Sequence, residues 1–83
     1  MQTVIKKTDD KKMRDKIMHS LMFVNEPVST ARVYDETKNW QDKIGIERLR
    51  KYLVELNKMG YLVMLKKGNG KYWIPISNYR ALY

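Results

Sequence analysis

Residues 44–62 read IGIERLRKYLVELNKMGYL and carry the clearest helical pattern of the chain. Four apolar residues recur there at steps of three, four and three, as they do on one face of an α-helix: Ile46, Leu49, Leu53 and Leu56. Gly60 is suited to the left-handed position that ends many helices. The pattern therefore predicts a helix over residues 45–58 whose opposite face is charged.

A β-hairpin is expected directly after this helix. Residues 61–66 and 71–76 are rich in the aromatic, β-branched and aliphatic side chains that favour strands. Between them, residues 67–70 read KGNG, and glycine and asparagine tolerate the positive φ of a tight turn. Pro75 suits a strand at the edge of a sheet, because proline lacks the N–H group of a ladder.

Two further helices are expected before residue 45. Apolar residues spaced by four, four and three predict the first over residues 10–25: Met13, Ile17, Leu21 and Val24. Pro27 ends that pattern, since the residue before a proline avoids the helical region. Ser29 and Thr30 are candidate caps for a short second helix over residues 30–38. A large aromatic residue, Trp40, follows on a connection, where we expect it to be buried at the edge of the core.

The length of 83 residues predicts one domain, because chains divide into several cores only well beyond this size. Residues 1–9 are interpreted as an N-terminal arm, in which Val4 and Ile5 are suited to an edge strand. Residues 77–83 are interpreted as a C-terminal tail that packs back on the domain.

The charge of the chain is strongly basic. Lysine and arginine number 17 against 9 acidic residues, which gives a formal net charge of +8. Residues 61–83 contain four of these bases and no acid. Such a surface attracts nucleic acid, anionic membranes or acidic proteins, and charge alone does not choose among these partners.

Several functional classes are excluded by composition. The chain has no cysteine, which removes disulfide scaffolds, cysteine-ligated zinc and thiol nucleophiles. A single histidine, His19, leaves little for a Ser-His-Asp arrangement. No carboxylate pair at catalytic spacing, metal cluster or nucleotide fingerprint is present, so we expect neither an enzyme nor a cofactor.

A membrane protein is not expected either. The longest apolar run, residues 61–65, is far shorter than the ~20 residues of a spanning helix. The N-terminus becomes charged too early for a signal peptide. We therefore expect a soluble cytoplasmic protein, associated with the nucleoid or, if viral, with the cytoplasm of its host.

The order of helix, short helix, helix and basic hairpin resembles the winged helix-turn-helix DNA-binding domains of bacterial, archaeal and phage proteins. The resemblance covers residues 10–76. It rests on the apolar spacing of the first helix and the helix cap that follows it, on residues 44–62, and on the glycine-rich hairpin. Around Trp40 the chain is longer than the tight turn of that family. The resemblance implies an α+β fold with a three-helix bundle and a two-stranded wing over residues 61–66 and 71–76.

The resemblance also implies how DNA is bound. In the family the third helix lies in the major groove, and the wing lies along the adjacent backbone or minor groove. The matching positions in this chain are Ser29, Thr30, Lys43, Gly45, Ile46, Glu47, Arg48, Arg50, Lys51, Lys66, Lys67, Asn69 and Lys71. The bases among them also have a plainer interpretation, because bases on a helix are usually a solvated face and lysines on a hairpin protect strand edges from aggregation.

The expected function is that of a small transcriptional regulator bound to duplex DNA. An alternative is a protein-interaction module of a virus or mobile element, whose basic surface would meet an acidic host protein such as a polymerase or nuclease. A binder of structured RNA is a further alternative. Many family members form homodimers. The candidate dimer residues lie outside the winged-helix unit: Val4, Ile5, Tyr79, Leu82 and Tyr83.

Overall fold

The computed structural model describes residues 2–40 and 44–82, with side chains from residue 10 onward. Within these residues the chain forms α1 (Gln2–Ser20), β1 (Val28–Ser29), α2 (Thr30–Thr37), α3 (Ile46–Lys58), β2 (Leu62–Lys67), β3 (Gly70–Pro75) and α4 (Ile76–Leu82). The strands make an antiparallel sheet in the order β1-β3-β2. The expected α+β class is confirmed, and the arrangement is compatible with a winged helix.

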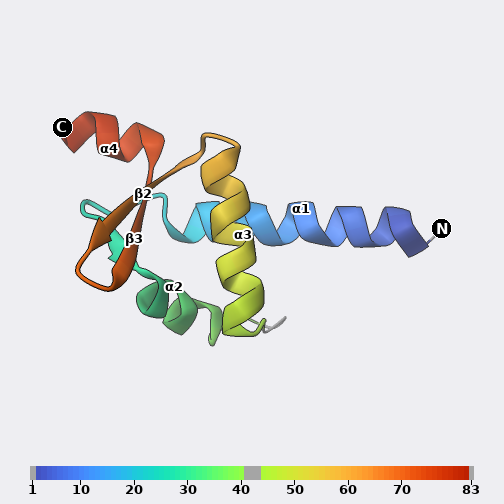
Figure 1. Ribbon diagram of the computed structural model, residues 1–83. Coiled ribbons are helices and arrows are strands. Elements are labelled where there is room, and N and C mark those ends of the chain that lie inside the picture. The colour runs from blue at the N-terminus through green and yellow to red at the C-terminus, as the bar shows by residue number, and fades with distance from the viewer. Residues whose placement is uncertain (1, 41–43, 83) are drawn as a thin grey trace.

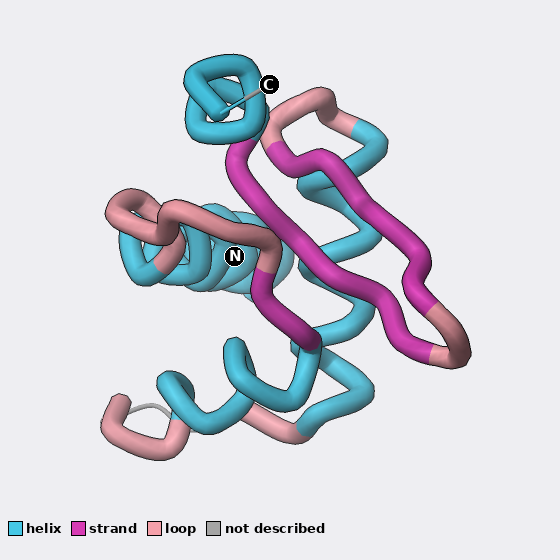
Figure 2. Tube along the Cα trace, turned by 90° about the vertical axis from the view of Figure 1, so that its left-hand side faces the viewer, coloured by secondary structure: helices cyan, strands magenta, loops and turns pink. Residues whose placement is uncertain are grey.

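The elements surround one core. In Figure 1, α3 crosses in front of α1, the sheet and α4 lie to one side, and the N-terminal end of α1 extends away on the other. Figure 2 shows the short β1 alongside one edge of β3, with β2 along the other. The most deeply buried apolar side chains come from α1, α2, α3 and β3: Ile17, Val33, Leu49, Leu53, Leu56, Trp73 and Ile74. Each such burial stabilises the fold by roughly 1.5–3 kcal/mol.

The third helix and the hairpin follow the sequence closely. α3 begins one residue after the predicted start and ends where expected. β2 and β3 are each displaced by one residue from their predicted bounds, and α2 ends one residue early. Gly60 has a φ of 87° and Gly68 a φ of 63°, so both occupy the left-handed region that their turns require.

The predicted N-terminal arm is wrong, because α1 begins at Gln2 instead of residue 10. Residues 2–20 contain no glycine or proline that would interrupt a helix. α1 also ends at Ser20, five residues before the predicted end. There the Ser20 hydroxyl donates a hydrogen bond to the Ile17 carbonyl oxygen at 2.7 Å, an alternative to continued helical bonding.

Two elements were not foreseen. Residues 28 and 29 form β1, in which Val28 pairs with Trp73 and Ser29 with Tyr72. The predicted tail is instead the helix α4, so residues 76–82 are ordered as a regular element. Helices this short are marginal in isolation, and α4 gains support from Asn78, whose amide donates to the carbonyl oxygens of Met22 at 2.9 Å and Val24 at 3.0 Å.

Candidate nucleic-acid interface

A groove of about 470 Å³ lies between the start of α2, the outer face of α3 and the β2–β3 hairpin. Five of the predicted site residues line it: Ser29, Thr30, Arg50, Asn69 and Lys71. Its other lining residues are Ala31, Val54, Gly70 and Trp73, so it contains two cations and no acid. The fold thus brings residues from three separated segments to one basic groove, which we call the α2–α3–hairpin groove.

The start of α2 forms one wall of this groove. The Ser29 hydroxyl accepts a hydrogen bond from the Arg32 backbone N–H at 3.2 Å, which confirms Ser29 as the helix cap. The Thr30 hydroxyl accepts one from the Trp73 indole N–H at 2.8 Å. Thr30 therefore fixes the hairpin against α2, and its side chain is already engaged within the protein.

The outer face of α3 forms the second wall. Glu47, Arg50 and Lys51 are exposed, as is Val54, whereas the opposite face of the helix is buried. Within the described part of the chain, Arg50 and Lys51 make no ion pair, which leaves both cations available to an anionic ligand. Gly45 is the N-cap of α3 and is exposed, and Ile46 is half-buried.

Arg48 differs from the other predicted contacts. Its Nε donates a hydrogen bond to the Tyr52 hydroxyl at 3.2 Å, and its Nη2 lies 3.8 Å from the Asp10 carboxylate on α1. Arg48 and Arg50 are two residues apart, which is about 200° around a helix. Arg48 is exposed, but its guanidinium is directed toward Asp10 on α1 and does not line the groove, so its contact with DNA stays a prediction.

Tyr52 lies at the centre of this polar link between α1 and α3. Its hydroxyl donates a hydrogen bond to Asp10 Oδ1 at 2.7 Å. Burial raises the pKa of Tyr52 above its usual value of 10.0, and the hydrogen bond to Asp10 raises it further, against a smaller opposing effect of Arg48. Beside it, Arg14 Nη1 and Glu55 Oε2 form an ion pair at 3.3 Å between the same two helices.

This raised pKa predicts a loss of stability in alkali. Unfolded tyrosine releases its proton near pH 10, before folded Tyr52 does, so its contribution is full below pH 10 and is lost as the pH rises through the folded pKa. Urea unfolding between about pH 8 and 11 is expected to show a steeper alkaline decline for the native chain than for Tyr52→Phe. Equal declines in the two proteins would contradict the assignment.

The hairpin forms the third wall. Lys66 lies directly opposite Lys71 in the register of β2 and β3, and like charges in that position destabilise a hairpin. Because side chains alternate along a strand, Lys66 and Lys71 share the face of Trp73, whereas Lys67 belongs to the other face. Of the hairpin lysines, Lys71 lines the groove, together with Asn69, whereas Lys66 and Lys67 do not.

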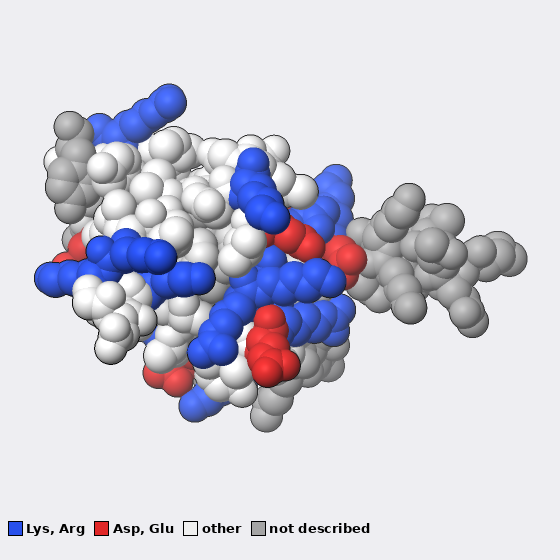
Figure 3. Space-filling view, in the orientation of Figure 1, with Lys and Arg blue, Asp and Glu red and all other residues white. Residues whose placement is uncertain are grey.

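Basic side chains gather at two places on the face that carries α3. Figure 3 shows one group over the hairpin and a second over α3, with mostly uncharged surface between them. Acidic side chains lie among the second group, in agreement with the ion pairs that Asp10 and Glu55 make. The hairpin group is therefore the less neutralised of the two.

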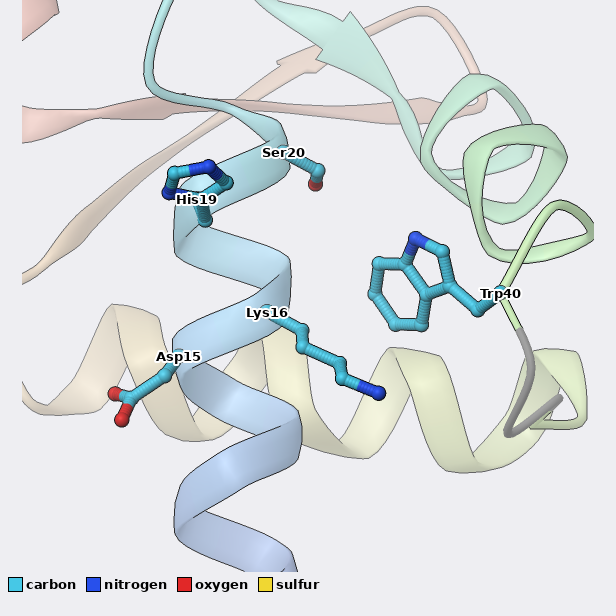
Figure 4. A pocket seen from close by; sticks show the side chains of 5 residues that line it. All are labelled: Asp15, Lys16, His19, Ser20 and Trp40. Carbon is cyan, nitrogen blue, oxygen red and sulfur yellow. The ribbon is translucent and has the colours of Figure 1, made fainter.

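A separate hollow of about 460 Å³ is lined by Asp15, Lys16, His19, Ser20 and Trp40. In Figure 4, Lys16 and Ser20 extend from the side of α1 that faces Trp40. The Lys16 ammonium lies 5.8 Å from the centre of the Trp40 ring, and Trp40 is half-buried against the core, so its predicted burial is confirmed in part. The Ser20 hydroxyl donates its proton to the Ile17 carbonyl oxygen at 2.7 Å.

The predicted dimer residues are scattered. Leu82 of α4 is 47% exposed and Tyr79 is half-buried. Val4 and Ile5 belong to α1, and their side chains lie outside the described structure, as do Tyr83 and the predicted contact Lys43. Sequence reasoning missed Phe23, which is 85% exposed on the turn that Asn78 holds, because that turn was expected to be helical.

No helix among residues 2–40 and 44–82 has both the length and the apolar character needed to cross a membrane. Across the same residues, no three histidine or acidic side chains gather as metal ligands. Comparison with protein-family models, with curated proteins and with solved structures finds no match.

Proposed function

We propose that this protein binds duplex DNA as a small transcriptional regulator, with α3 in the major groove and the β2–β3 hairpin as a wing on the adjacent backbone. The observation that carries the proposal is the acid-free lining of the α2–α3–hairpin groove, in which Arg50 and Lys71 meet the start of α2. A protein with this role would lie in the cytoplasm, in association with the nucleoid.

The dimensions of α3 support this mode of binding. Its 13 residues span about 20 Å, and one side of the helix is exposed along that length. The major groove of DNA, about 12 Å wide, admits an α-helix. Ser29 already caps the Arg32 N–H, and the other first N–H groups of α2 have no acceptor within the helix and favour an anion, so a backbone phosphate would be stabilised beside Arg50.

The plainer interpretation of the lysines explains less. β2 is an edge strand, so Lys66 and Lys67 would serve there against edge-to-edge pairing. That role does not account for the placement of two lysines, Lys66 and Lys71, directly opposite each other. A phosphate between Lys66 and Lys71 would relieve their repulsion, which favours an anionic ligand.

The test is a titration of labelled random-sequence duplex DNA at about 50 and 200 mM salt. About five phosphates would be neutralised by five bases of α3 and the hairpin: Arg50, Lys51, Lys66, Lys67 and Lys71. The logarithm of the binding constant should therefore fall with the logarithm of the salt concentration at a slope near −4.5. We expect micromolar or tighter binding at the lower salt and about 500-fold weaker binding at the higher salt. Double-stranded RNA, added as competitor, should displace the DNA poorly. No binding at 50 mM salt would overturn the proposal.

A second candidate function is a protein-interaction module. The exposed Phe23, on a turn that Asn78 fixes through two hydrogen bonds, favours a protein contact outside the basic groove. A failed DNA titration would make an acidic protein the preferred ligand of the basic face. Contacts between two copies through α4, including Leu82, belong to the same class of interaction.

A further inference from the structure

The outer face of α3 includes an aliphatic residue that the core does not use. Val54 is 37% exposed and lies in the α2–α3–hairpin groove, whereas the buried face of the helix is formed by other residues. Valine is also a weaker helix former than the lysine, glutamate or arginine common at such positions. Because 37% of Val54 stays exposed, packing accounts for only part of its surface, and helix formation does not favour a valine there.

A ligand that offered only phosphate groups would not explain the valine at position 54 either. Phosphates are bound by cations and N–H donors, which Val54 cannot provide. Glu47, exposed on the same face and without an ion pair in the described structure, would repel a phosphate. A face that mixes a cation, an acid and an aliphatic group matches the edges of bases, which offer acceptors, donors and a methyl group.

Val54 and Arg50 are four residues apart, and both line the groove. In the major groove, the thymine methyl is the apolar group available to an aliphatic side chain, and guanine O6 and N7 are the acceptor pair that arginine recognises. Four residues of helix rise about 6 Å, which corresponds to about two base steps.

We infer that Val54 and Arg50 are specificity-determining residues, and that Val54 contacts a thymine methyl about two base steps from a guanine bound by Arg50. The inference rests on the proposed function, since it requires α3 in the major groove. It adds a sequence requirement to that function: DNA sites that contain this thymine and guanine are bound more tightly than random duplex.

The test begins with selection of bound sites from a pool of randomised duplexes. In a selected duplex, each thymine is then replaced in turn by deoxyuridine, which removes only the methyl group. We expect one replacement to weaken binding of the native protein about fourfold, the effect of losing one buried methyl-sized group. Deoxyuridine at the other positions serves as the control and should leave the affinity unchanged.

Val54→Ala supplies the second half of the test. This variant should bind the thymine duplex about fourfold more weakly than the native protein does. Replacement of the thymine by deoxyuridine should then cause no further loss of affinity for the variant. Alanine is the better helix former at this exposed position, so α3 should remain folded. Val54→Ile should retain the discrimination between thymine and deoxyuridine.

The outcomes separate the inference from the proposed function. Binding that is indifferent to every thymine methyl, or a methyl effect of equal size in Val54→Ala, overturns the inference and leaves DNA binding intact. Failure to bind any duplex overturns the proposed function itself.

Discussion

Replacement of Trp73 by alanine is expected to lower the free energy of unfolding by about 3–5 kcal/mol. Trp73 is 2% exposed, lies at the middle of β3, and pairs with Val28 of β1 on one side and Met64 of β2 on the other. A domain of this length is stable by only about 4–12 kcal/mol, so the variant should be close to unfolding. Urea unfolding followed by far-ultraviolet circular dichroism measures the change.

Two further variants separate the packing of Trp73 from its hydrogen bond. Trp73→Phe keeps most of the aromatic volume but leaves the Thr30 hydroxyl without its donor, and Thr30→Val leaves the buried indole N–H without its acceptor. The double variant should recover about 1 kcal/mol relative to the sum of the single changes. Trp40→Ala, at a half-buried position, serves as the comparison and should cost less. A loss below about 1 kcal/mol for Trp73→Ala would contradict the packing of β3 described above.

α3 and the hairpin could be predicted because their signals are local and repeated. The apolar stripe of α3 extends over three turns, so an error at one position does not change the interpretation. The glycines at positions 60 and 68 mark turns that require positive φ. Both kinds of signal are contained within the segment that they describe.

β1 and α4 were missed because the deciding interactions lie elsewhere in the chain. β1 has two residues, too few for a periodic pattern, and it exists because β3 offers it a partner. α4 gains support from bonds between Asn78 and the turn after α1, more than fifty residues earlier. The ion pair of Arg48 with Asp10 could not be predicted either, because Asp10 lies on another helix.

For the α2–α3–hairpin groove too, local features could be predicted from the sequence and long-range ones could not. Residue types on α3 and the hairpin were sufficient to nominate Arg50 and Lys71. The sequence did not reveal that both face the start of α2, because that depends on the bond between Trp73 and Thr30, which joins positions 43 residues apart. It also did not reveal that Lys66 and Lys71 are direct neighbours, since a hairpin's register follows from its turn.

Removal of Lys66 and Lys71 together with Arg50 is expected to weaken DNA binding strongly. The triple variant Arg50→Ala, Lys66→Ala, Lys71→Ala should bind duplex DNA more than about 100-fold more weakly at 0.1 M salt, because three phosphate contacts are lost. With two of the five bases left, the slope of log K against log salt should fall from about −4.5 to about −1.8. Fluorescence anisotropy with the same labelled duplex across a salt series measures both quantities.

The matched control removes the same charge elsewhere. Lys12→Ala, Lys38→Ala, Arg80→Ala changes three exposed bases that lie outside both the groove and the hairpin, and both triple variants carry a formal charge of 8 − 3 = +5. The control should keep a slope near −4.5 and lose only a few-fold in affinity through long-range attraction. Equal losses in the two variants would show that net charge alone attracts the DNA, which would contradict a defined interface.

Charge reversal at Lys66 distinguishes a binding role from a structural one. In Lys66→Glu, the glutamate faces Lys71 across the hairpin and replaces a repulsion by an attraction, so the fold should gain about 0.2–1 kcal/mol. DNA affinity should nevertheless fall about tenfold or more, since a phosphate would then meet an acid. Stability and affinity therefore change in opposite directions, and loss of folding cannot explain the loss of binding. If Lys66 serves only to protect the strand edge, the variant gains stability and binds DNA as before.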